Sequence, residues 1–223
     1  MKKKIIYNIM KKKLLVLLIL VGIASSSFGQ YDEKALGILD AMSARYSKLA
    51  SFKASFSYIL ENEMEKIHEE FSGTIIVKGD KFKLDLDEQE VYNDGETMWT
   101  YLKDVNEVNI DYYFPEDEDM TPSTIFSAYK NGYKYLFLEE ETIDNNIYNV
   151  IDLVPDDQDK PFFKVRLWIK KSDNTLFRWK LFDRTGNIYL YSITSFNDNY
   201  NAGDQEFVFD SSRYPGVTEI DLR

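Results

Sequence analysis

The sequence predicts an α+β fold that is mainly β: about eleven antiparallel strands in a strongly curved, unclosed half-barrel with helices packed on one side. Three observations lead to this prediction. An amphipathic helical pattern comes first, apolar and polar residues then alternate with a period of two, and one short helix interrupts the strands. A sheet of about eleven strands is close to the size at which open sheets curl.

The first helix is predicted over residues 32–49. Its apolar positions recur at the spacing of one helical stripe, so this face should pack on the sheet. The stripe consists of Ala35, Ile38, Leu39, Met42, Tyr46 and Leu49.

Alternation with a period of two begins at Phe52 and predicts the strands. Tight turns with Gly, such as Gly79-Asp80 and Asn93-Asp94-Gly95, join several of them into hairpins. The expected strands are residues 52–60, 67–77, 81–86, 90–93, 97–102, 106–113, 133–138, 147–154, 162–170, 176–182 and 188–197.

A second, short helix is predicted over residues 122–130. Thr121 supplies a capping hydroxyl, and Pro122 suits the first helical position. No repeat, low-complexity tract or long linker divides residues 30–223, so we expect one domain.

The first 29 residues are typical of a secretory signal peptide. Lysines at residues 11–13 precede the apolar run of residues 14–24, and small residues before Gln30 suit cleavage. The run is shorter than the roughly 20 residues needed to span a bilayer. We expect residues 1–29 to be removed, with either Met1 or Met10 as the start.

Charge and composition narrow the function classes. The net charge is −11, and it becomes −17 without residues 1–29, which contain lysines but no acidic residue. A surface this acidic disfavours nucleic-acid binding. The absence of Cys excludes thiol nucleophiles, Cys-based zinc sites and attachment of lipid to an N-terminal Cys. We therefore expect a soluble, exported, periplasmic protein.

Catalytic and metal-binding motifs are not found. His68-Glu69 begins like a zinc-protease motif, but Ser72 stands where the second His would be. Asp85 and Asp87 resemble the start of a calcium loop, yet Glu90 replaces the required Gly. The sequence predicts no enzyme activity, no metal and no cofactor.

Several strands are apolar on both faces, for example residues 97–102 and 162–170. Antiparallel sheets usually leave one face exposed to solvent. Either helices and loops cover the second face, or the concave face lines a cavity for an apolar ligand. Periodicity alone does not separate these readings.

In order and spacing, these segments resemble the LolA family of periplasmic carriers, which move lipoproteins to the outer membrane. The resemblance extends over residues 31–223. It is carried by residues 49–56 (LASFKASF), 73–84 (GTIIVKGDKFKL) and, most specifically, 93–101 (NDGETMWTY), followed by Thr121-Pro122, residues 183–187 (DRTGN), 207–209 (FVF) and 214–217 (YPGV).

The resemblance implies an unclosed barrel whose helices form a lid over a hydrophobic cavity. The expected cavity wall consists of Phe52, Phe56, Ile75, Phe82, Leu84, Leu86, Trp99, Tyr101, Trp168 and Trp179. The expected lid residues are Leu39, Met42, Tyr46, Ile125, Phe126 and Tyr129.

One position departs from the family pattern. Family members commonly have an Arg before a Pro-containing turn, where it hydrogen-bonds carbonyls of the lid. Here Lys78 and Gly79 are the counterparts and the Pro is missing. Lys78 keeps the charge without the planar fork of donors, so we expect it to be a weaker or different lid latch.

Three hypotheses follow for the function. The first is a periplasmic carrier that binds lipoprotein acyl chains, in which case the resemblance implies an inner-membrane release complex and an outer-membrane receptor as partners. The second is a lipid- or amphiphile-binding or sensing module without lipoprotein transfer. The third is an exported hydrolase, which would need a polar cleft with convergent carboxylates. The expected protein is a monomer.

Overall fold

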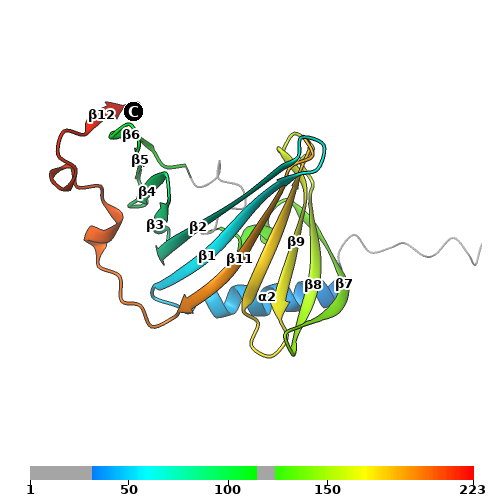
Figure 1. The fold of residues 1–223 in the computed structure, drawn as a ribbon. Helices are drawn as coiled ribbons and strands as arrows, with labels where there is room; N and C mark the ends of the chain where they lie inside the picture. Colours follow the sequence, from blue (N-terminus) through cyan, green and yellow to red (C-terminus); the bar gives the residue numbers. More distant parts are fainter. Residues whose placement is uncertain (1–31, 115–123) are drawn as a thin grey trace, which may run out of the picture. The chain divides into compact units, whose positions relative to one another are not determined.

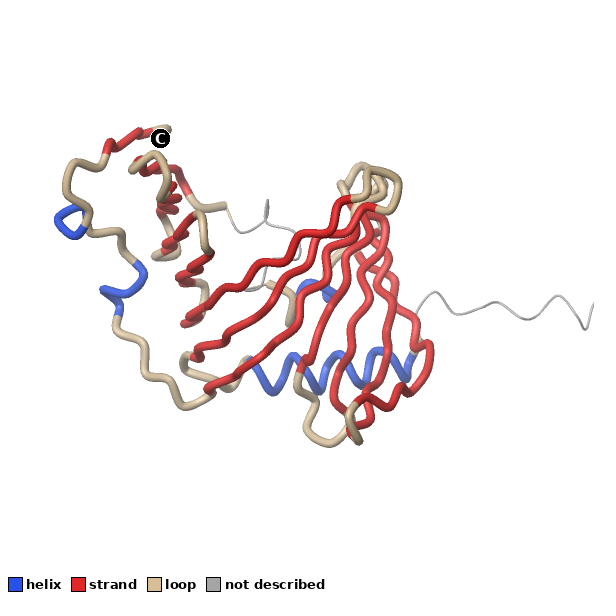
Figure 2. Tube along the Cα trace, viewed as in Figure 1, coloured by secondary structure: helices blue, strands red, loops and turns tan. Residues whose placement is uncertain are grey.

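The computed structural model describes residues 32–114 and 124–223, which are mainly β and form one open sheet (Figures 1 and 2). The strands are β1 (Phe52–Asn62), β2 (Ile67–Lys78), β3 (Lys81–Leu86), β4 (Gln89–Asn93), β5 (Thr97–Leu102), β6 (Glu107–Tyr112), β7 (Tyr133–Ile143), β8 (Asn146–Pro155), β9 (Phe162–Lys170), β10 (Leu176–Asp183), β11 (Ile188–Asn197) and β12 (Thr218–Asp221). Their order is β12-β6-β5-β4-β3-β2-β1-β11-β10-β9-β8-β7.

Neighbouring strands are antiparallel except β12 and β6, which are parallel. Every strand predicted from alternation is present, so the predicted fold class is confirmed. β12 was not predicted because Thr218–Asp221 is short and mostly exposed, with no alternating apolar pattern. Backbone pairing with β6 forms this strand.

The single α-helix of the described residues, α2 (Glu33–Tyr46), lies across one face of the sheet (Figure 1). The carboxylate of Asp32 caps it, accepting hydrogen bonds from the backbone N–H groups of Lys34 at 2.9 Å and Ala35 at 3.2 Å. The helix ends before residue 49, where it was predicted to end, because i→i−3 bonds from Lys48 and Leu49 tighten the last turn. None of the described helices is long and apolar enough to cross a bilayer.

The helix predicted over residues 122–130 is not an α-helix in its described part. Residues 124–127 form a turn, and η1 (Ala128–Lys130) is one turn of 3₁₀-helix. Ser127 has a φ of −132°, which interrupts helical geometry before η1. Thr121 and Pro122, the predicted helix start, lie outside the described residues.

The two faces of the sheet are covered differently. We call the face against α2 the inner face and the opposite one the outer face. The C-terminal segment, residues 198–217, covers the outer face near β2–β6 and includes η2 (Asp204–Phe207) and η3 (Ser211–Arg213). Phe207 packs on Ile76, and Phe209 packs on Tyr92 and Tyr101. Coverage of both faces therefore explains why strands such as β5 are apolar on both sides.

Candidate functional site

The inner face is a continuous apolar wall across β1, β2 and β3. Cross-strand pairing places Phe52 beside Val77 and then Phe82, and places Ala54 beside Ile75 and then Leu84. The aromatic and branched side chains of this wall are buried or half-buried in the main hydrophobic cluster. The predicted wall residues Phe52, Phe56, Ile75, Phe82, Leu84, Leu86 and Trp179 all belong to this cluster or pack against it.

Gly73 allows this wall to pack closely. It pairs with Phe56 on β1 and Leu86 on β3. A Cβ at this position would lie 2.8 Å from Phe56 Cζ, 2.7 Å from Leu86 Cδ2 and 2.9 Å from the carbonyl oxygen of Asp85. Glycine at residue 73 therefore leaves the space that the Phe56 ring occupies.

α2 and residues 124–130, which we call the cover, close over this wall. Leu39, Met42 and Ile125 are 0% exposed, and each belongs to the same cluster as the wall residues. The Tyr46 ring stacks on Phe126 with centroids 3.7 Å apart and meets the edge of Phe52 at 6.0 Å. The residues predicted to form a lid thus contact the predicted wall directly.

Hydrogen bonds fix both ends of α2 to the sheet. Asp32 accepts from the backbone N–H of Phe137 on β7 at 3.0 Å, in addition to capping the helix. The Tyr46 hydroxyl accepts from the buried backbone N–H of Leu176 on β10 at 3.1 Å. Burial raises the pKa of Asp32, but the three backbone donors outweigh burial and hold its pKa below the usual value. Burial raises the pKa of Tyr46 to about 12.

The two parts of the cover are also joined to each other. The Tyr129 hydroxyl donates a hydrogen bond to Asp40 Oδ1 on α2 at 2.7 Å. Burial raises the pKa of Tyr129, and the Asp40 carboxylate adds to that rise because it binds the protonated hydroxyl. This contact is a polar tie between α2 and residues 124–130.

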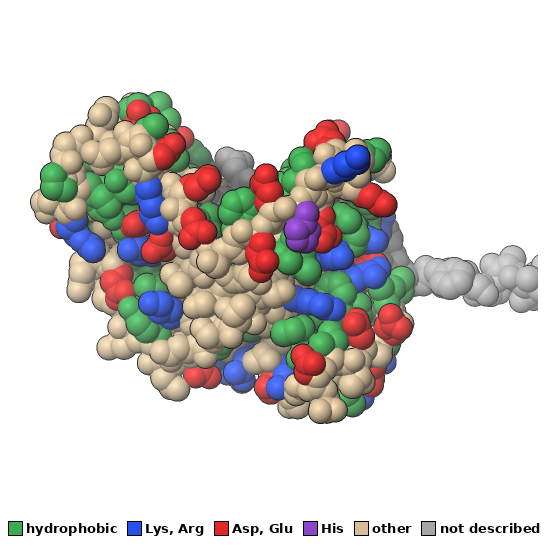
Figure 3. Space-filling view, in the orientation of Figure 1, with side chains coloured by type: hydrophobic (Ala, Val, Ile, Leu, Met, Phe, Trp, Pro, Cys, Tyr) green, Lys and Arg blue, Asp and Glu red, His purple; other side chains and the backbone are tan. Residues whose placement is uncertain are grey.

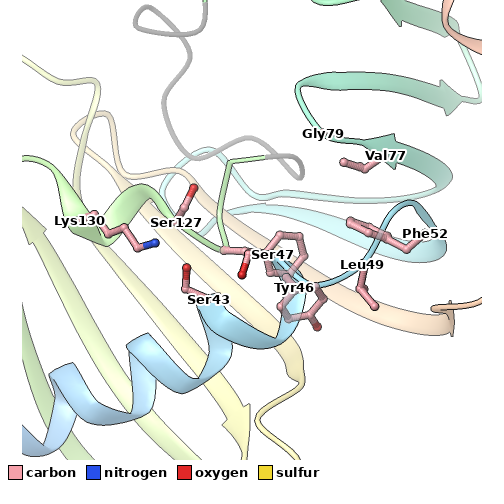
Figure 4. Close-up of a pocket in the computed structure, with 10 residues that line it drawn as sticks. Ser43, Tyr46, Ser47, Leu49, Phe52, Val77, Gly79, Ser127 and Lys130 are labelled. Carbon is pink, nitrogen blue, oxygen red and sulfur yellow. The ribbon is translucent and has the colours of Figure 1, made fainter. Parts of the chain in front are cut away.

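A cavity of about 220 Å³ lies where the cover meets the wall (Figure 4). It is bounded by the end of α2, by the start of β1, by the β2–β3 turn and by residues 126–130. Its lining mixes apolar and polar groups, and Lys130 and Ser127 come from the cover. The complete lining is Ser43, Tyr46, Ser47, Leu49, Phe52, Val77, Gly79, Phe126, Ser127 and Lys130.

Tyr46 also borders a second cavity of about 220 Å³, at the ends of β9, β10 and β11. Leu176, Ile193 and Phe196 line its apolar side, and Lys170 and Ser195 contribute polar atoms. Tyr46 therefore contributes to the lining of two small cavities at the end of α2.

Four aromatic rings form a stack across the inner face of β2, β1, β11 and β10. Phe71 stacks on Tyr58 and Tyr58 on Tyr191 with centroids 5.1 Å apart in each pair, and Tyr191 stacks on Trp179 at 4.8 Å. Trp179 is 2% exposed, whereas the other three rings are half-buried. The stack extends the apolar wall beyond the buried core.

Comparison with known proteins assigns the chain to a family. The family model described as "Outer membrane lipoprotein carrier protein LolA" matches residues 47–210, most of the chain. The chain belongs to the LolA family. No curated protein sequence matches it significantly.

Solved structures agree with the fold of this LolA-family chain. An uncharacterised conserved protein from Thermus thermophilus has a TM-score of 0.57 at 14% identity, covering 85% of this chain and 99% of that one. A LolA superfamily protein from Nitrosomonas europaea has a TM-score of 0.45 at 14% identity, over 79% of this chain and 98% of that one. At these identities the first of the two supports the fold alone, and the second has too low a score to add support.

The prediction that Trp99, Tyr101 and Trp168 face the cavity is wrong. Pairing places Trp99 beside Tyr92 and places Trp168 beside Arg178, all on the outer face. Tyr101 packs on Phe209 of the C-terminal segment, and Trp168 Nε1 donates to Glu141 Oε2 at 2.6 Å. Because these strands are apolar on both faces, alternation could not decide which set of residues faces α2.

The prediction that Lys78 latches the lid is also wrong. Lys78 lies on the outer face with Ile76, two residues before it in β2. Its Nζ donates to the carbonyl of Ala202 at 3.2 Å and to Asp204 Oδ1 at 3.0 Å. In this LolA-family chain Lys78 therefore holds the C-terminal segment on the sheet. Asp32 and Tyr46 tie the cover to the sheet, and Tyr129 ties its two parts together.

Sequence reasoning missed several inner-face residues, namely Tyr58, Phe71, Phe137, Tyr191 and Phe196. The signal was present for Tyr58, because it continues the alternation of Phe52, Ala54 and Phe56 along β1. Tyr191 and Phe196 could not be placed in the same way: the β1–β11 register shifts between Ser55 and Phe56. A bulge of this kind interrupts the alternation with a period of two, so residues beyond it change face.

Proposed function

We propose that this LolA-family chain is a periplasmic carrier that binds the acyl chains of lipoproteins on its inner face and moves them from the inner to the outer membrane. In this proposal residues 1–29 are a signal peptide and residues 30–223 are the carrier domain. Binding and release involve no covalent step.

The observation that carries the proposal is the contact between the cover and the wall. Apolar residues of α2 and of residues 124–130 share one cluster with apolar residues of β1, β2, β3 and β10. Movement of the cover would expose a wide apolar surface on both parts. That surface is suited to acyl chains, because each methylene group removed from water contributes about 0.8 kcal/mol.

The arrangement described corresponds to a closed carrier. The cavity between the cover and the wall measures about 220 Å³, below the range of roughly 300–1,000 Å³ typical of sites for drug-sized ligands. A complete acyl chain therefore requires the cover to move. Polar ties of the cover, such as those at Asp32, Tyr46 and Tyr129, would have to break in such a movement.

Delivery would need a protein at each membrane. The chain's net charge of −11, which becomes −17 without residues 1–29, repels anionic head groups. We therefore propose an inner-membrane release complex and an outer-membrane receptor as partners, with the protein itself travelling as a monomer.

Mass spectrometry of the protein purified from the periplasm under mild conditions tests the cargo. The proposal expects lipoproteins, bound in a one-to-one ratio and lost in the inner-face variant Phe82→Glu but retained in Val105→Glu, which changes a residue 58% exposed in the β5–β6 turn. Co-purification of free lipids alone would favour a lipid-binding or sensing module. A preparation without any amphiphile, and without binding of a synthetic acylated peptide, would contradict both functions.

A further inference from the structure

Basic side chains gather on the outer face of β9 and β10, in a chain that is acidic as a whole. Cross-strand pairing places Arg166 beside Lys180 and Lys164 beside Phe182, and Arg178 lies beside Trp168. All these residues alternate with the buried inner-face residues of the same strands. We call Lys164, Arg166, Arg178 and Lys180 the basic patch.

Aromatic and apolar side chains lie among these cations. The Lys164 ammonium is 4.0 Å from the centre of the Phe182 ring, and the Arg178 guanidinium is 4.3 Å from that of Trp168. Figure 3 shows Lys and Arg side chains among hydrophobic ones over the part of the sheet where Figure 1 draws β9 and β11. At the border of the patch, Phe163 and Val154 are each 43% exposed.

Half of the basic patch lacks a carboxylate partner. Arg166 forms a bidentate pair with Asp152 at 2.6 and 2.9 Å, and Arg178 lies 3.5 Å from Glu141. Lys164 and Lys180 have no salt bridge to any described residue. Their contacts are with the Phe182 ring, and Lys180 is 5.9 Å from its centre. Two ammonium groups therefore remain available to an external anion.

Acidic residues surround the patch. Glu139 and Glu141 lie on β7, beside Val150 and Tyr148 of β8. On the opposite side Glu61 of β1 pairs with Ile188, which pairs in turn with Phe182. These carboxylates lie within a few strand spacings of about 4.8 Å, so they limit the shape of anion that the patch can accept.

The outer face of β8–β10 has no covering segment among the described residues, in contrast to the outer face of β2–β6, which the C-terminal segment covers. We propose that the basic patch is a docking surface for an acidic segment of a partner protein that also carries apolar side chains. Acidic groups would pair with Lys164 and Lys180, and apolar groups would contact Phe163, Phe182 and Val154.

A narrow acidic segment fits this surface better than an anionic bilayer. A flat bilayer would bring negative charge over Glu139, Glu141 and Glu61 as well as over the cations, within the Debye length of about 8 Å at physiological salt. An extended peptide can lie along the basic patch and avoid those carboxylates. Charge complementarity therefore favours a protein partner.

Fluorescence anisotropy with a labelled peptide of alternating Glu and Phe residues tests the docking surface. The test variant is Lys164→Glu/Lys180→Glu. The matched control is Lys48→Glu/Lys66→Glu, which makes the same change of net charge at two exposed lysines outside the patch. The wild type and the control should bind the peptide, and the test variant should bind about tenfold more weakly.

Neutralisation by Lys164→Gln/Lys180→Gln removes the charges but keeps a polar side chain at each position. It should weaken peptide binding by a smaller factor, which provides the test if the charge-reversed variant does not fold. Equal weakening by the patch and control pairs, or no binding by the wild type, would overturn the proposal. So would patch-dependent flotation with anionic vesicles, since that identifies a bilayer as the ligand. Binding of acylated peptides on the inner face should be unchanged in both patch variants, so this test is independent of the carrier proposal.

Discussion

Replacing Tyr129 with Phe removes the hydroxyl that hydrogen-bonds residues 124–130 to Asp40 and Ser43 of α2, and leaves the ring in place. The Tyr129 hydroxyl is 2.7 Å from Asp40 Oδ1. Asp40 is exposed, so water can hydrate its carboxylate after the change. The cost is therefore close to that of an ordinary hydrogen bond, about 1–1.5 kcal/mol, which corresponds to roughly a five- to tenfold increase in opening.

Native-state hydrogen exchange measures this opening directly. The amides of Ser127, Ala128 and Lys130 are bonded within the turn and η1, so they report on residues 124–130. In Tyr129→Phe these amides should exchange about five- to tenfold faster, while the amides of β1 and β10 stay unchanged. Tyr112→Phe, at a residue 55% exposed, is the control. Unchanged exchange, or an equal increase in all strands, would refute a separately opening cover.

The remaining predictions concern the wall, the close approach at β2 and alkaline pH. Phe82→Glu buries a charge in the wall and should lower the free energy of unfolding by more than about 3 kcal/mol and abolish acyl-chain binding, whereas Val105→Glu, at a residue 58% exposed, should do neither. Unchanged stability and binding in Phe82→Glu would mean that residue 82 is not in the wall. Gly73→Ala should destabilise by about 1–3 kcal/mol in urea unfolding, while Gly37→Ala, with nothing within 4 Å of the added methyl, should stabilise slightly; equal effects would contradict the close packing. The pKa of Tyr46 is raised to about 12 in the fold, so the protonated hydroxyl contributes its full share of the free energy of unfolding below pH 10 and loses it as the pH rises towards 12. Tyr46→Phe should therefore reduce the alkaline loss of stability by about 2–3 kcal/mol. Identical stability–pH profiles of the wild type and the variant would contradict this.

Much of the fold could be predicted from sequence because its strands follow local rules. Alternation along β1 and β9, and glycine in the turn at Gly79, which has a φ of +58°, are visible in short windows. β12 could not be predicted in this way. Thr218–Asp221 becomes a strand only through its pairing with β6, more than a hundred residues away in sequence.

The candidate site was harder to predict because strand alternation defines two faces but does not say which one α2 covers. On β3 the choice was clear, because Phe82 and Leu84 alternate with Lys and Asp, and both lie at the inner face. On β5 both sets of side chains are apolar, and Trp99 and Tyr101 proved to face the C-terminal segment. Only the tertiary position of that segment decides between the faces.

Residue roles inferred from the family pattern also depended on tertiary contacts that the sequence does not show. Lys78 was expected to replace an arginine of the lid, since charge and chain position agree. Its side chain instead points to the outer face, where Ala202 and Asp204 supply the acceptors. The ties within the cover, such as Tyr129 with Asp40, join residues 89 positions apart and leave no local signal.

The most direct test of acyl-chain binding on the inner face uses the position of the tryptophans. The chain has three: Trp179 lies in the inner cluster, and Trp99 and Trp168 lie on the outer face. In Trp99→Phe/Trp168→Phe, the fluorescence of Trp179 should be quenched by a lipopeptide with brominated acyl chains. In Trp168→Phe/Trp179→Phe, where Trp99 alone remains, quenching should be absent. Quenching of Trp99 but not of Trp179 would contradict binding beneath the cover.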